Sequence, residues 1–377
     1  MRIEKLILRE IHLRLKAPFE TSFGRMAERR IVLVEAVSEA ISGWGEITAA
    51  EGPYYNSETT DTAWIVFSEF IAPLVVGREI AAAADVGQLL APIRGHEMAK
   101  AGLECALWDL EAKRKAMPLA RLLEGSRDEI SCGVSIGIQA SPAALCSTVE
   151  RELAAGYQRI KMKIKPGKDR DFIDGVRKRF PQIDLMVDAN SAYTLADLPH
   201  LKSFDQFRLM MIEQPLAWDD IYQHARLQAV LKTPVCLDES IRNCRDAEAA
   251  IAMKACQVIN IKLGRVGGHS EAKRVEHLCR EQSIPVWCGG MLESGIGRAH
   301  NIAISSLPGF VLPGDVSASQ RYWDEDIIHP EVEVSARGTI RVPVAPGIGY
   351  EVRSTRIEKL TVRHQSFESR PAVVPVG

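Results

Sequence analysis

The sequence lacks the features that mark membrane proteins and nucleic-acid-binding proteins. No stretch approaches the roughly 18 uninterrupted apolar residues that a membrane-spanning helix requires. Residues 1–19 carry a charge every two or three positions, so they lack the apolar core of a signal peptide. The formal net charge is −2, whereas a general nucleic-acid-binding protein carries a strong basic excess. We therefore expect neither a membrane nor a nucleic acid as a partner.

Paired cysteine motifs are also absent. The chain has eight cysteines, and none of them forms a CxxC pair or the paired spacing of a zinc site. Scattered cysteines of this kind are typical of reduced, mostly buried thiols, which predicts a cytoplasmic protein. They are Cys105, Cys132, Cys146, Cys236, Cys244, Cys256, Cys279 and Cys288.

What the chain does contain is typical of a soluble globular protein, large enough for two or three domains unless one of them is a barrel. Its 377 residues are 46% hydrophobic and 25% charged. Residues 1–125 show strand patterns followed by apolar helical patterns, which predicts an α+β domain. The expected strands lie near 11–15, 31–34 and 43–47, and the expected helices cover 60–74 and 98–116.

A different pattern begins at residue 130, where eight short apolar runs each end in a polar or glycine-rich tip. The runs are SCGVSIGI, RIKMKIKPG, IDLMVDAN, LMMIEQP, TPVCLDES, QVINIKLG, IPVWCGGM and GFVLPGD. Helical segments lie between most of them, including 169–179, 224–231, 246–253 and 270–282. Eight alternating units predict an α/β fold with a parallel (β/α)-barrel over residues 126–325. Residues 326–377 show only short strands and end in ESRPAVVPVG, which is typical of a loose tail.

Charged side chains stand at the ends of five successive runs. Lys163, Asp188, Glu213, Asp238 and Lys262 follow one another at steps of 25, 25, 25 and 24 residues. In a barrel the carboxyl ends of the strands meet at one mouth, so these groups are expected around one site at one depth. A single acidic strand tip is equally well explained by a helix N-cap, but three in succession favour a functional site.

The three acidic residues are predicted to be metal ligands. Carboxylates that converge in a partly buried mouth raise each other's pKa unless a cation lies among them. Ligation by oxygen alone, without Cys or His, favours a hard ion that keeps positions for water and substrate. We therefore predict Mg²⁺, with Mn²⁺ as the alternative, on Asp188, Glu213 and Asp238.

The lysines on either side of these ligands are predicted to be the acid–base groups. Lys161 and Lys163 lie one strand before the first ligand, and Lys262 lies one strand after the last. Lys161 beside Lys163, and Arg265 close to Lys262, are cationic neighbours expected to lower the pKa of each base. A small carboxylate substrate between two lysines and the metal suits removal of its α-proton, with Lys161 helping to stabilise the enolate oxygens.

These residues resemble the muconate-lactonizing-enzyme-like subgroup of the enolase superfamily over nearly the whole chain. The likeness rests on the KxK of Lys161 and Lys163, on the spacing of the three carboxylates, and on the KLG that begins at Lys262. The resemblance implies an α+β capping domain, a (β/α)7β TIM-like barrel with Mg²⁺ on three carboxylates, and a C-terminal segment that returns to the cap. It also implies a homo-oligomer.

Longer strings resemble one family within that subgroup, the o-succinylbenzoate synthases and N-succinylamino-acid racemases. They are APFETSFG, GWGEITAAEGPYYNSET, CGGMLESGIGRAHNIAISSLPGF, LPGDVSAS and RYWDEDI. The resemblance implies a lyase for a dehydration in menaquinone biosynthesis, an isomerase that racemises N-acylamino acids, or both. It also implies that Lys163 and Lys262 serve opposite faces of the substrate. The two reactions share a proton-abstraction step, so the residues leave open which one is physiological, which side chain is preferred, and which lysine serves which face.

Other members of the superfamily match less well. The seventh run, IPVWCGGM, lacks the histidine of mandelate-racemase-like enzymes, and LPGDVSAS contains only Asp315 where dipeptide epimerases carry Asp-x-Asp. Asp315 is instead expected to be a cap or turn residue. Another cycloisomerase or a dipeptide epimerase remains the alternative activity. A Schiff-base aldolase would not need three metal ligands, and an inactive scaffold would not need to keep every lysine and ligand.

Several further residues are predicted to contact the substrate or to support the lysines. The cap aromatic residues Phe19, Phe23 and Tyr55 are expected to line the distal pocket if the cap closes the barrel mouth. Glu239 is predicted to be a partner of a lysine outside the metal site, as is Arg265. Polar or backbone contacts to substrate at strand tips are expected from Ser135, Asn190, Gly289 and Met291.

The remaining charged residues of the barrel have no predicted role in the chemistry. Arg159 and Lys165 flank the two lysines on the same strand and are expected to be ordinary surface residues. The histidines in helix or loop patterns are expected to lie at the surface or to cap helices, namely His96, His224, His269, His277 and His300.

Overall fold

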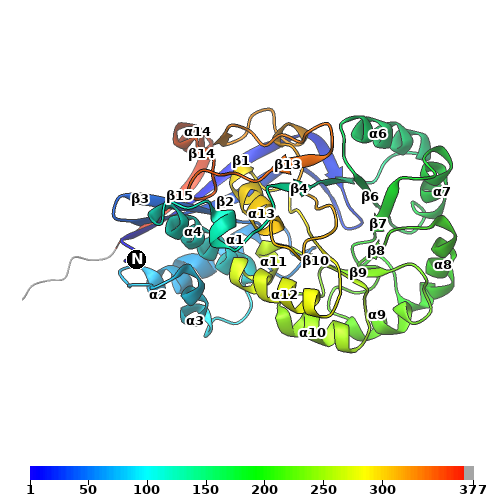
Figure 1. The fold of residues 1–377 in the computed structure, drawn as a ribbon, viewed down its shortest axis with the longest axis horizontal. Coiled ribbons are helices and arrows are strands. Elements are labelled where there is room, and N and C mark those ends of the chain that lie inside the picture. The colour runs from blue at the N-terminus through cyan, green and yellow to red at the C-terminus, as the bar shows by residue number, and fades with distance from the viewer. Residues whose placement is uncertain (369–377) are drawn as a thin grey trace, which may run out of the picture.

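The computed structural model describes residues 1–368, which form an antiparallel sheet and a parallel barrel (Figure 1). The antiparallel sheet has the strand order β15-β1-β2-β3, with β1 at Lys5–Glu20, β2 at Arg25–Ser38, β3 at Ile41–Ile47 and β15 at Thr361–Glu368. Helix α4 (Glu97–Arg114) packs against β3. A Cβ atom at Gly43 or Gly45 would meet backbone oxygen atoms of this helix at 2.1 Å. The glycines of GWGEI therefore allow the close approach of helix and sheet.

The helix expected over residues 60–74 is present but is not a single α-helix. It consists of α1 (Thr60–Val66), a π-helical segment (Phe67–Ile71) and α2 (Ala72–Val75). Thr59 begins the helix with a capping box that it shares with Thr62. Pro73 has no N–H to donate to the preceding turn, which accounts for the change of register before α2.

The barrel is a sheet of seven parallel strands that follow one another in chain order. They are β5 (Gly133–Ile136), β6 (Arg159–Lys163), β7 (Asp184–Asp188), β8 (Ile212–Glu213), β9 (Val235–Leu237), β10 (Val258–Ile261) and β11 (Val286–Cys288). The eighth run forms two single bridges, from Phe310 to Val286 and from Gly314 to Cys132. It thus joins both edges of the sheet, and the predicted α/β fold, a TIM-like barrel with an N-terminal cap, is confirmed.

Helices cover the outside of the barrel (Figure 1). The four helices located from the sequence are present as α7 (Arg170–Arg179), α9 (Ile221–Gln228), α10 (Cys244–Ala252) and α12 (His269–Glu281). Helices α6 (Pro142–Ala154) and α13 (Gly295–Ser305) were not located. Every residue of α13 is buried, including the polar residues Arg298, His300 and Asn301.

The described part of the chain also contains short α-helices and strands. They are α3 (Val86–Leu90), α5 (Leu119–Leu122), α8 (Leu198–Lys202), α11 (Leu263–Val266), α14 (Ser354–Leu360), β4 (Glu129–Ser131), β12 (Ile328–His329), β13 (Thr339–Arg341) and β14 (Glu351–Val352). The last strand, β15, pairs antiparallel with β1. The division of the chain into 1–125, 126–325 and 326–377 remains a prediction, and residues 369–377 of the expected loose tail lie outside the described residues.

Two of the histidines expected at the surface are buried between the cap and the barrel. His269 in α12 lies 2.9 Å from His300 in α13, and His300 lies 2.7 Å from the carbonyl oxygen of Trp44 in β3. Burial lowers the pKa of both rings, so they are neutral links between the two parts of the molecule. Within residues 1–368, one group of at least three His, Cys, Asp or Glu residues has ligand atoms that all lie within 4.8 Å of one another. It consists of His269, His300 and Cys105. His224, also expected at the surface, is buried in α9.

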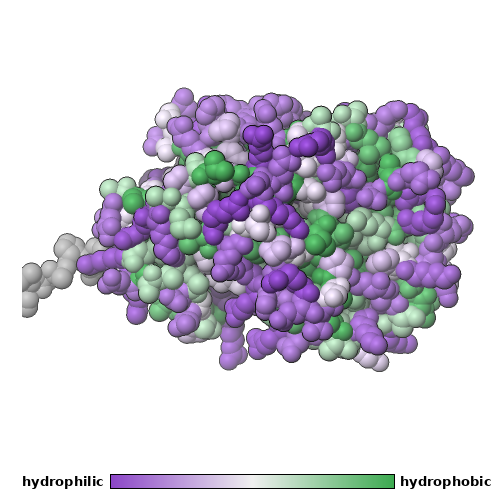
Figure 2. Space-filling view, viewed as in Figure 1, coloured by the Kyte–Doolittle hydropathy of each residue, from purple (hydrophilic) through white to green (hydrophobic). Residues whose placement is uncertain are grey.

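The face shown in Figure 2 is mixed in polarity. On the face shown in Figure 2, hydrophobic residues occur in small groups among hydrophilic ones. Over residues 1–368, no helix combines the length and the apolar character that crossing a bilayer would demand.

Candidate active site

Strand β6 directs three cationic side chains into the barrel. Arg159, Lys161 and Lys163 alternate with the apolar Ile160 and Met162, and all five are buried. The expectation that Arg159 is a surface residue is wrong. Its guanidinium lies 2.8 Å from Asp315 Oδ1, because the first residue of β6 faces the barrel interior as the two lysines do.

The three predicted metal ligands stand at the carboxyl ends of successive strands. Asp188 ends β7, Glu213 ends β8, and Asp238 directly follows β9. The strand register pairs Lys163 with Asp188 and Asp188 with Glu213, so these three residues lie at one level of the barrel. Glu213 pairs with Cys236, and Asp238 is therefore two residues further along its strand. All three carboxylates are 0% exposed.

Each lysine contacts carboxylates directly. Lys161 Nζ lies 2.9 Å from Glu213 Oε2 and 3.4 Å from Asp188 Oδ2. Lys163 Nζ lies 2.5 Å from the same Asp188 oxygen. On the other side of the mouth, Lys262 Nζ lies 2.8 Å from Asp238 Oδ2. The barrel therefore gathers the three lysines and the three predicted ligands at one mouth, in two sets of contacts, and the three carboxylates do not have ligand atoms that all lie within 4.8 Å of one another.

The expectation that a cationic neighbour lowers the pKa of the base is wrong for Lys262. Burial opposes the charge of Lys161, but Asp315, Glu213 and Asp188 outweigh burial and raise its pKa. Burial also opposes the charge of Lys262, and Asp238 is the first of the anions that raise its pKa well above the usual value. The nearest charges to both ammonium groups are anionic, a relation that the spacing of the lysines along the chain does not reveal.

Asp315 is not a cap or turn residue. Its carboxylate is buried between Arg159 and Lys161, with Oδ2 at 2.6 Å from Lys161 Nζ. Ser135 donates a hydrogen bond of 3.0 Å to the same oxygen. Burial would raise the pKa of Asp315, but the two cations lower it further than burial raises it. Asp315 thus fixes the position of Lys161 and accepts the hydrogen bond of the Ser135 hydroxyl group.

Asp238 is held by groups from both the barrel and the cap. Arg265 forms an ion pair with Asp238 Oδ1, and the hydroxyl group of Tyr55 donates a 2.8 Å hydrogen bond to the same oxygen. Lys262 Nζ lies 4.5 Å from the centre of the Tyr55 ring, which is within the range of a cation–π contact. Arg265 is therefore a partner of the predicted ligand rather than a cationic neighbour of Lys262 alone.

Lys163 is connected to Glu239 through Asn190. Lys163 donates to Asn190 Oδ1 at 2.7 Å, and Asn190 Nδ2 donates to Glu239 Oε1 at 2.9 Å. Burial, followed by Asp238 and Asp188, raises the pKa of Glu239 to about 8. The predicted support of a lysine by Glu239 is therefore indirect, with an amide side chain between the two.

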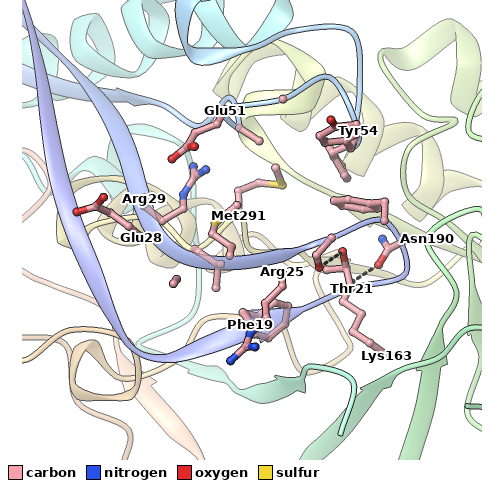
Figure 3. Close-up of a pocket in the computed structure, with 18 of the residues that line it drawn as sticks. Phe19, Thr21, Arg25, Glu28, Arg29, Glu51, Tyr54, Lys163, Asn190 and Met291 are labelled. Carbon is pink, nitrogen blue, oxygen red and sulfur yellow. Dashed lines mark hydrogen bonds between the residues drawn. The ribbon is translucent and has the colours of Figure 1, made fainter. Parts of the chain in front are cut away.

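A cavity of about 400 Å³ lies between the cap loops and the barrel mouth. Figure 3 shows Lys163 and Asn190 on its barrel side and Arg29 and Glu51 at its other end. Its volume falls within the range of small-molecule sites. The predicted residues that line this cavity are Phe19, Phe23, Tyr55, Lys163, Asn190, Lys262 and Met291.

The structure does not bring Ser135 or Gly289 to this cavity. Ser135 turns towards Asp315, as described above. A Cβ atom at Gly289 would meet Lys262 Cε at 2.7 Å, so this glycine provides room for the lysine rather than a wall for a ligand. Sequence analysis missed Arg25 and Arg29, which also line the cavity from β2. Their spacing of four places them on one face of a strand, a signal that the local pattern of β2 contained.

Comparison with protein families identifies the class of enzyme. Residues 144–356 match the family model described as enolase C-terminal domain-like. Residues 3–124 match the N-terminal domain of mandelate racemase / muconate lactonizing enzyme. The chain therefore belongs to the mandelate racemase and muconate lactonizing enzyme family of the enolase superfamily, as the sequence resemblance implied.

Individual relatives narrow this class. The chain is 55% identical to an o-succinylbenzoate synthase of Geobacillus kaustophilus over 360 residues, covering 95% of this chain and 96% of that protein. It is 46% identical to an N-succinylamino acid racemase of Thermus thermophilus over 362 residues, covering 96% and 98% of the two chains.

Solved structures match the fold over almost the whole chain. A member of the enolase superfamily from Listeria innocua superposes with a TM-score of 0.94 at 42% identity, covering 98% of this chain and 99% of that one. A dipeptide epimerase from Cytophaga hutchinsonii, whose crystal structure is a complex with Mg and a dipeptide, superposes with a TM-score of 0.89. It covers 97% of this chain and 100% of that one at 24% identity, so it shares the fold alone.

Proposed function

We propose that the chain is an Mg²⁺-dependent enzyme that removes the α-proton of a small carboxylate substrate to form an enolate. The activity is that of an o-succinylbenzoate synthase, of an N-succinylamino-acid racemase, or of both. The observation that carries this proposal is the pair Lys163 and Lys262, which face one cavity beside three buried carboxylates. The relatives that are 46% and 55% identical to this chain support the choice of substrates.

The donor set fits a hard divalent cation. Asp188, Glu213 and Asp238 offer only oxygen atoms, and all three are fully buried. Burial, followed by the charge of Asp188, raises the pKa of Glu213 well above its usual value despite the nearby lysines. The lysines alone thus leave the ionised form of this group disfavoured. We assign Mg²⁺, with Mn²⁺ as the alternative, to these three residues, where it would act as a Lewis acid towards the substrate carboxylate.

The lysines carry the proton transfers in this proposal. One lysine takes the α-proton in its neutral form, which a cation on the three carboxylates would favour by offsetting the anions that raise the lysine pKa. The electron pair of the broken C–H bond moves into the carboxylate of the substrate. In racemisation, the ammonium group of the other lysine returns a proton to the opposite face of the planar enolate. In dehydration, the electron pair of the enolate instead expels the hydroxyl group of the adjacent carbon, which takes up the proton held by the lysine and leaves as water. Lys161, fixed by Asp315, contributes positive charge beside the enolate oxygens.

The cavity walls supply orientation and exclude water. Phe19, Phe23, Tyr55 and Met291 surround the space above the lysines, and we propose that they contact the distal part of the substrate. Asn190 is proposed as a polar contact as well as a support of Lys163.

The alternative activity as a dipeptide epimerase receives less support. An ammonium group of a substrate needs a free carboxylate beyond the eighth strand. Asp315 is already engaged by Arg159, Lys161 and Ser135, and its neighbours in LPGDVSAS are not acidic. A cycloisomerase would use the same two lysines, and this shared chemistry makes it the second candidate activity.

We also propose a cytoplasmic homo-oligomer with a cap over 1–125, a barrel over 126–325 and a returning segment over 326–377. All eight cysteines lie in the described residues as free thiols, which is compatible with a reducing compartment. The pairing of β15 with β1 supports a return of the C-terminal segment to the cap.

The proposed function is tested by two assays on the purified enzyme with Mg²⁺. The first uses the cyclohexadiene precursor of o-succinylbenzoate and measures its dehydration. The second uses N-succinylamino acids of both hands in D₂O and measures exchange of the α-proton. We expect activity in at least one assay, and activity in neither would overturn the assignment. A Lys adduct trapped by borohydride with substrate would instead indicate Schiff-base chemistry.

A further inference from the structure

The turn between β1 and β2 reaches from the cap to the barrel mouth. The two strands pair up to Phe19 with Met26 and Glu20 with Arg25, and Thr21 N donates to the carbonyl oxygen of Gly24 at 2.8 Å. Residues 21–24 therefore close a tight hairpin, which we call the cap hairpin turn. Figure 3 shows Thr21 close to Lys163 and Asn190.

Three hydrogen-bonded contacts join this hairpin to the barrel. The backbone N–H of Ile138 donates to the carbonyl oxygen of Glu20 at 2.9 Å, and Lys165 Nζ lies 3.1 Å from Glu20 Oε1. The hydroxyl group of Ser22 donates to the carbonyl oxygen of Asn190 at 3.0 Å. The first two contacts hold the base of the turn. The third ends on the residue that contacts Lys163.

Asn190 has a backbone that requires support. Its φ is +42° and that of Ser191 is +62°, so two consecutive residues other than glycine adopt left-handed conformations. The backbone N–H of Asn190 donates to Asp188 Oδ1 at 3.0 Å. Ser22 donates to the carbonyl group on the other side of the same residue, and the N–H of that peptide unit, on Ser191, donates to the carbonyl oxygen of Gln214 at 2.8 Å. The Asn190 side chain, which lies between Lys163 and Glu239, is thus oriented from both of its peptide groups.

Lys262 is held by a different part of the cap. Its contacts come from Asp238 and from the ring of Tyr55, which belongs to the loop after β3. The two cap loops therefore approach the two lysines separately. A change in the cap hairpin turn that acts through Asn190 is expected to reach Lys163 first.

We propose that Ser22 is a positioning residue that orients Lys163, through Asn190, when the cap hairpin turn is seated on the barrel. This inference rests on the proposed function, because it assigns Ser22 to one of the two proton transfers. Ser22 does not contact the reacting atoms. Through Ser22, the position of the cap affects the orientation of Lys163. The orientation of Lys262 depends on Tyr55 instead.

The test measures α-deuterium exchange in D₂O from each hand of two probes, N-succinylalanine and N-succinylphenylalanine. Lys163→Ala first identifies the hand whose α-proton faces Lys163, because exchange from that hand is the one it abolishes. Ser22→Ala removes the hydroxyl group, and Ser22→Thr retains it. Lys165→Met is the matched control, since it loosens the same hairpin without removing the contact to Asn190.

We expect Ser22→Ala to slow exchange from the enantiomer whose α-proton faces Lys163 (the Lys163 hand) about five- to tenfold more than exchange from the other enantiomer. This factor corresponds to the loss of one hydrogen bond. Ser22→Thr should restore the wild-type ratio, and Lys165→Met should slow both hands equally. Equal slowing of both hands by Ser22→Ala, or no slowing, would overturn the inference while the proposed function stands. Wild-type enzyme that exchanges neither hand of either probe and does not dehydrate the cyclohexadiene would overturn the proposed function itself.

Discussion

Lys163 and Lys262 face the same cavity but are held by different kinds of contact. Lys163 is bound by Asp188 and by the amide of Asn190, whose backbone accepts a hydrogen bond from the cap. Lys262 is bound by Asp238 and lies over the Tyr55 ring. One side depends on a chain of directional hydrogen bonds, and the other depends on a charge pair and an aromatic surface. The proposed reaction uses the two lysines in equivalent roles, but the contacts that position them differ. The two proton transfers should therefore respond differently to mutation.

The largest test of this comparison removes the lysines one at a time. Lys163→Ala and Lys262→Ala should each reduce racemisation by about 10²- to 10⁴-fold, because each variant lacks one of the two acid–base groups. Each should still exchange the α-proton of the hand that faces the remaining lysine, measured by NMR in D₂O. If both variants racemise at the wild-type rate, the two-base mechanism is wrong.

The next test removes the proposed cation, which should affect exchange on the Lys163 side and the Lys262 side together. Treatment with a chelator should reduce exchange from both hands by about 10²-fold or more, since the proposed cation serves one substrate carboxylate whichever lysine acts. Added Mg²⁺ should restore the activity. Glu213→Gln should weaken Mg²⁺ binding in isothermal titration calorimetry.

Two results would contradict the assignment of Mg²⁺ to the three carboxylates. Chelated enzyme with full activity, or Glu213→Gln with unchanged Mg²⁺ affinity, would contradict the placement of the cation. A loss confined to one hand would show that the cation belongs to one side of the site only.

A third test concerns the stability of the Lys163 strand. Asp315→Asn removes the charge that Arg159 and Lys161 share, and leaves two buried cations of β6 without it. We expect the free energy of unfolding to fall by about 3–5 kcal/mol, measured in urea. Glu150→Gln is the control, because its pair with Arg179 is exposed and contributes about 0–1 kcal/mol. Equal stability of the two variants would show that Asp315 is dispensable to the barrel.

The smallest expected effect lies on the Lys262 side. Tyr55→Phe keeps the ring near Lys262 and removes the hydrogen bond to Asp238. Exchange from the Lys262 hand should slow by about five- to tenfold relative to the other hand, which mirrors the effect expected for Ser22→Ala. Tyr222→Phe, on an exposed residue of α9, is the control. An equal effect on both hands would remove the distinction between the two cap loops.

Much of the fold was predictable because the barrel repeats one local unit. Seven of the eight apolar runs became strands, and the four helices located between them are present. Helix α13 was not located; it is buried on all sides, so the polar residues Arg298, His300 and Asn301 in its sequence do not mark an exposed face. The eighth run gave no regular strand and forms only single bridges.

The residues of the candidate site were predictable from the sequence, but the contacts between them were not. The steps from Lys163 to Lys262 follow the length of one βα unit, and strand ends of parallel units meet at one mouth. Nothing in those steps shows that Arg159 and Lys161 share Asp315, or that Lys161 and Lys262 lie closer to anions than to cations. The expected lowering of the Lys262 pKa by a neighbouring cation was wrong for that reason.

The sequence by itself determined the order of the strands, the strand ends at which the charged groups stand and the family, because each depends on local period and spacing. Tertiary structure alone decided which distant groups meet. Ser22 and Asn190 are 168 residues apart, and Ser135 and Asp315 are 180 residues apart. Such contacts arise when the cap seats on the barrel and when the last strand closes on the first, and a local pattern contains no information on either event.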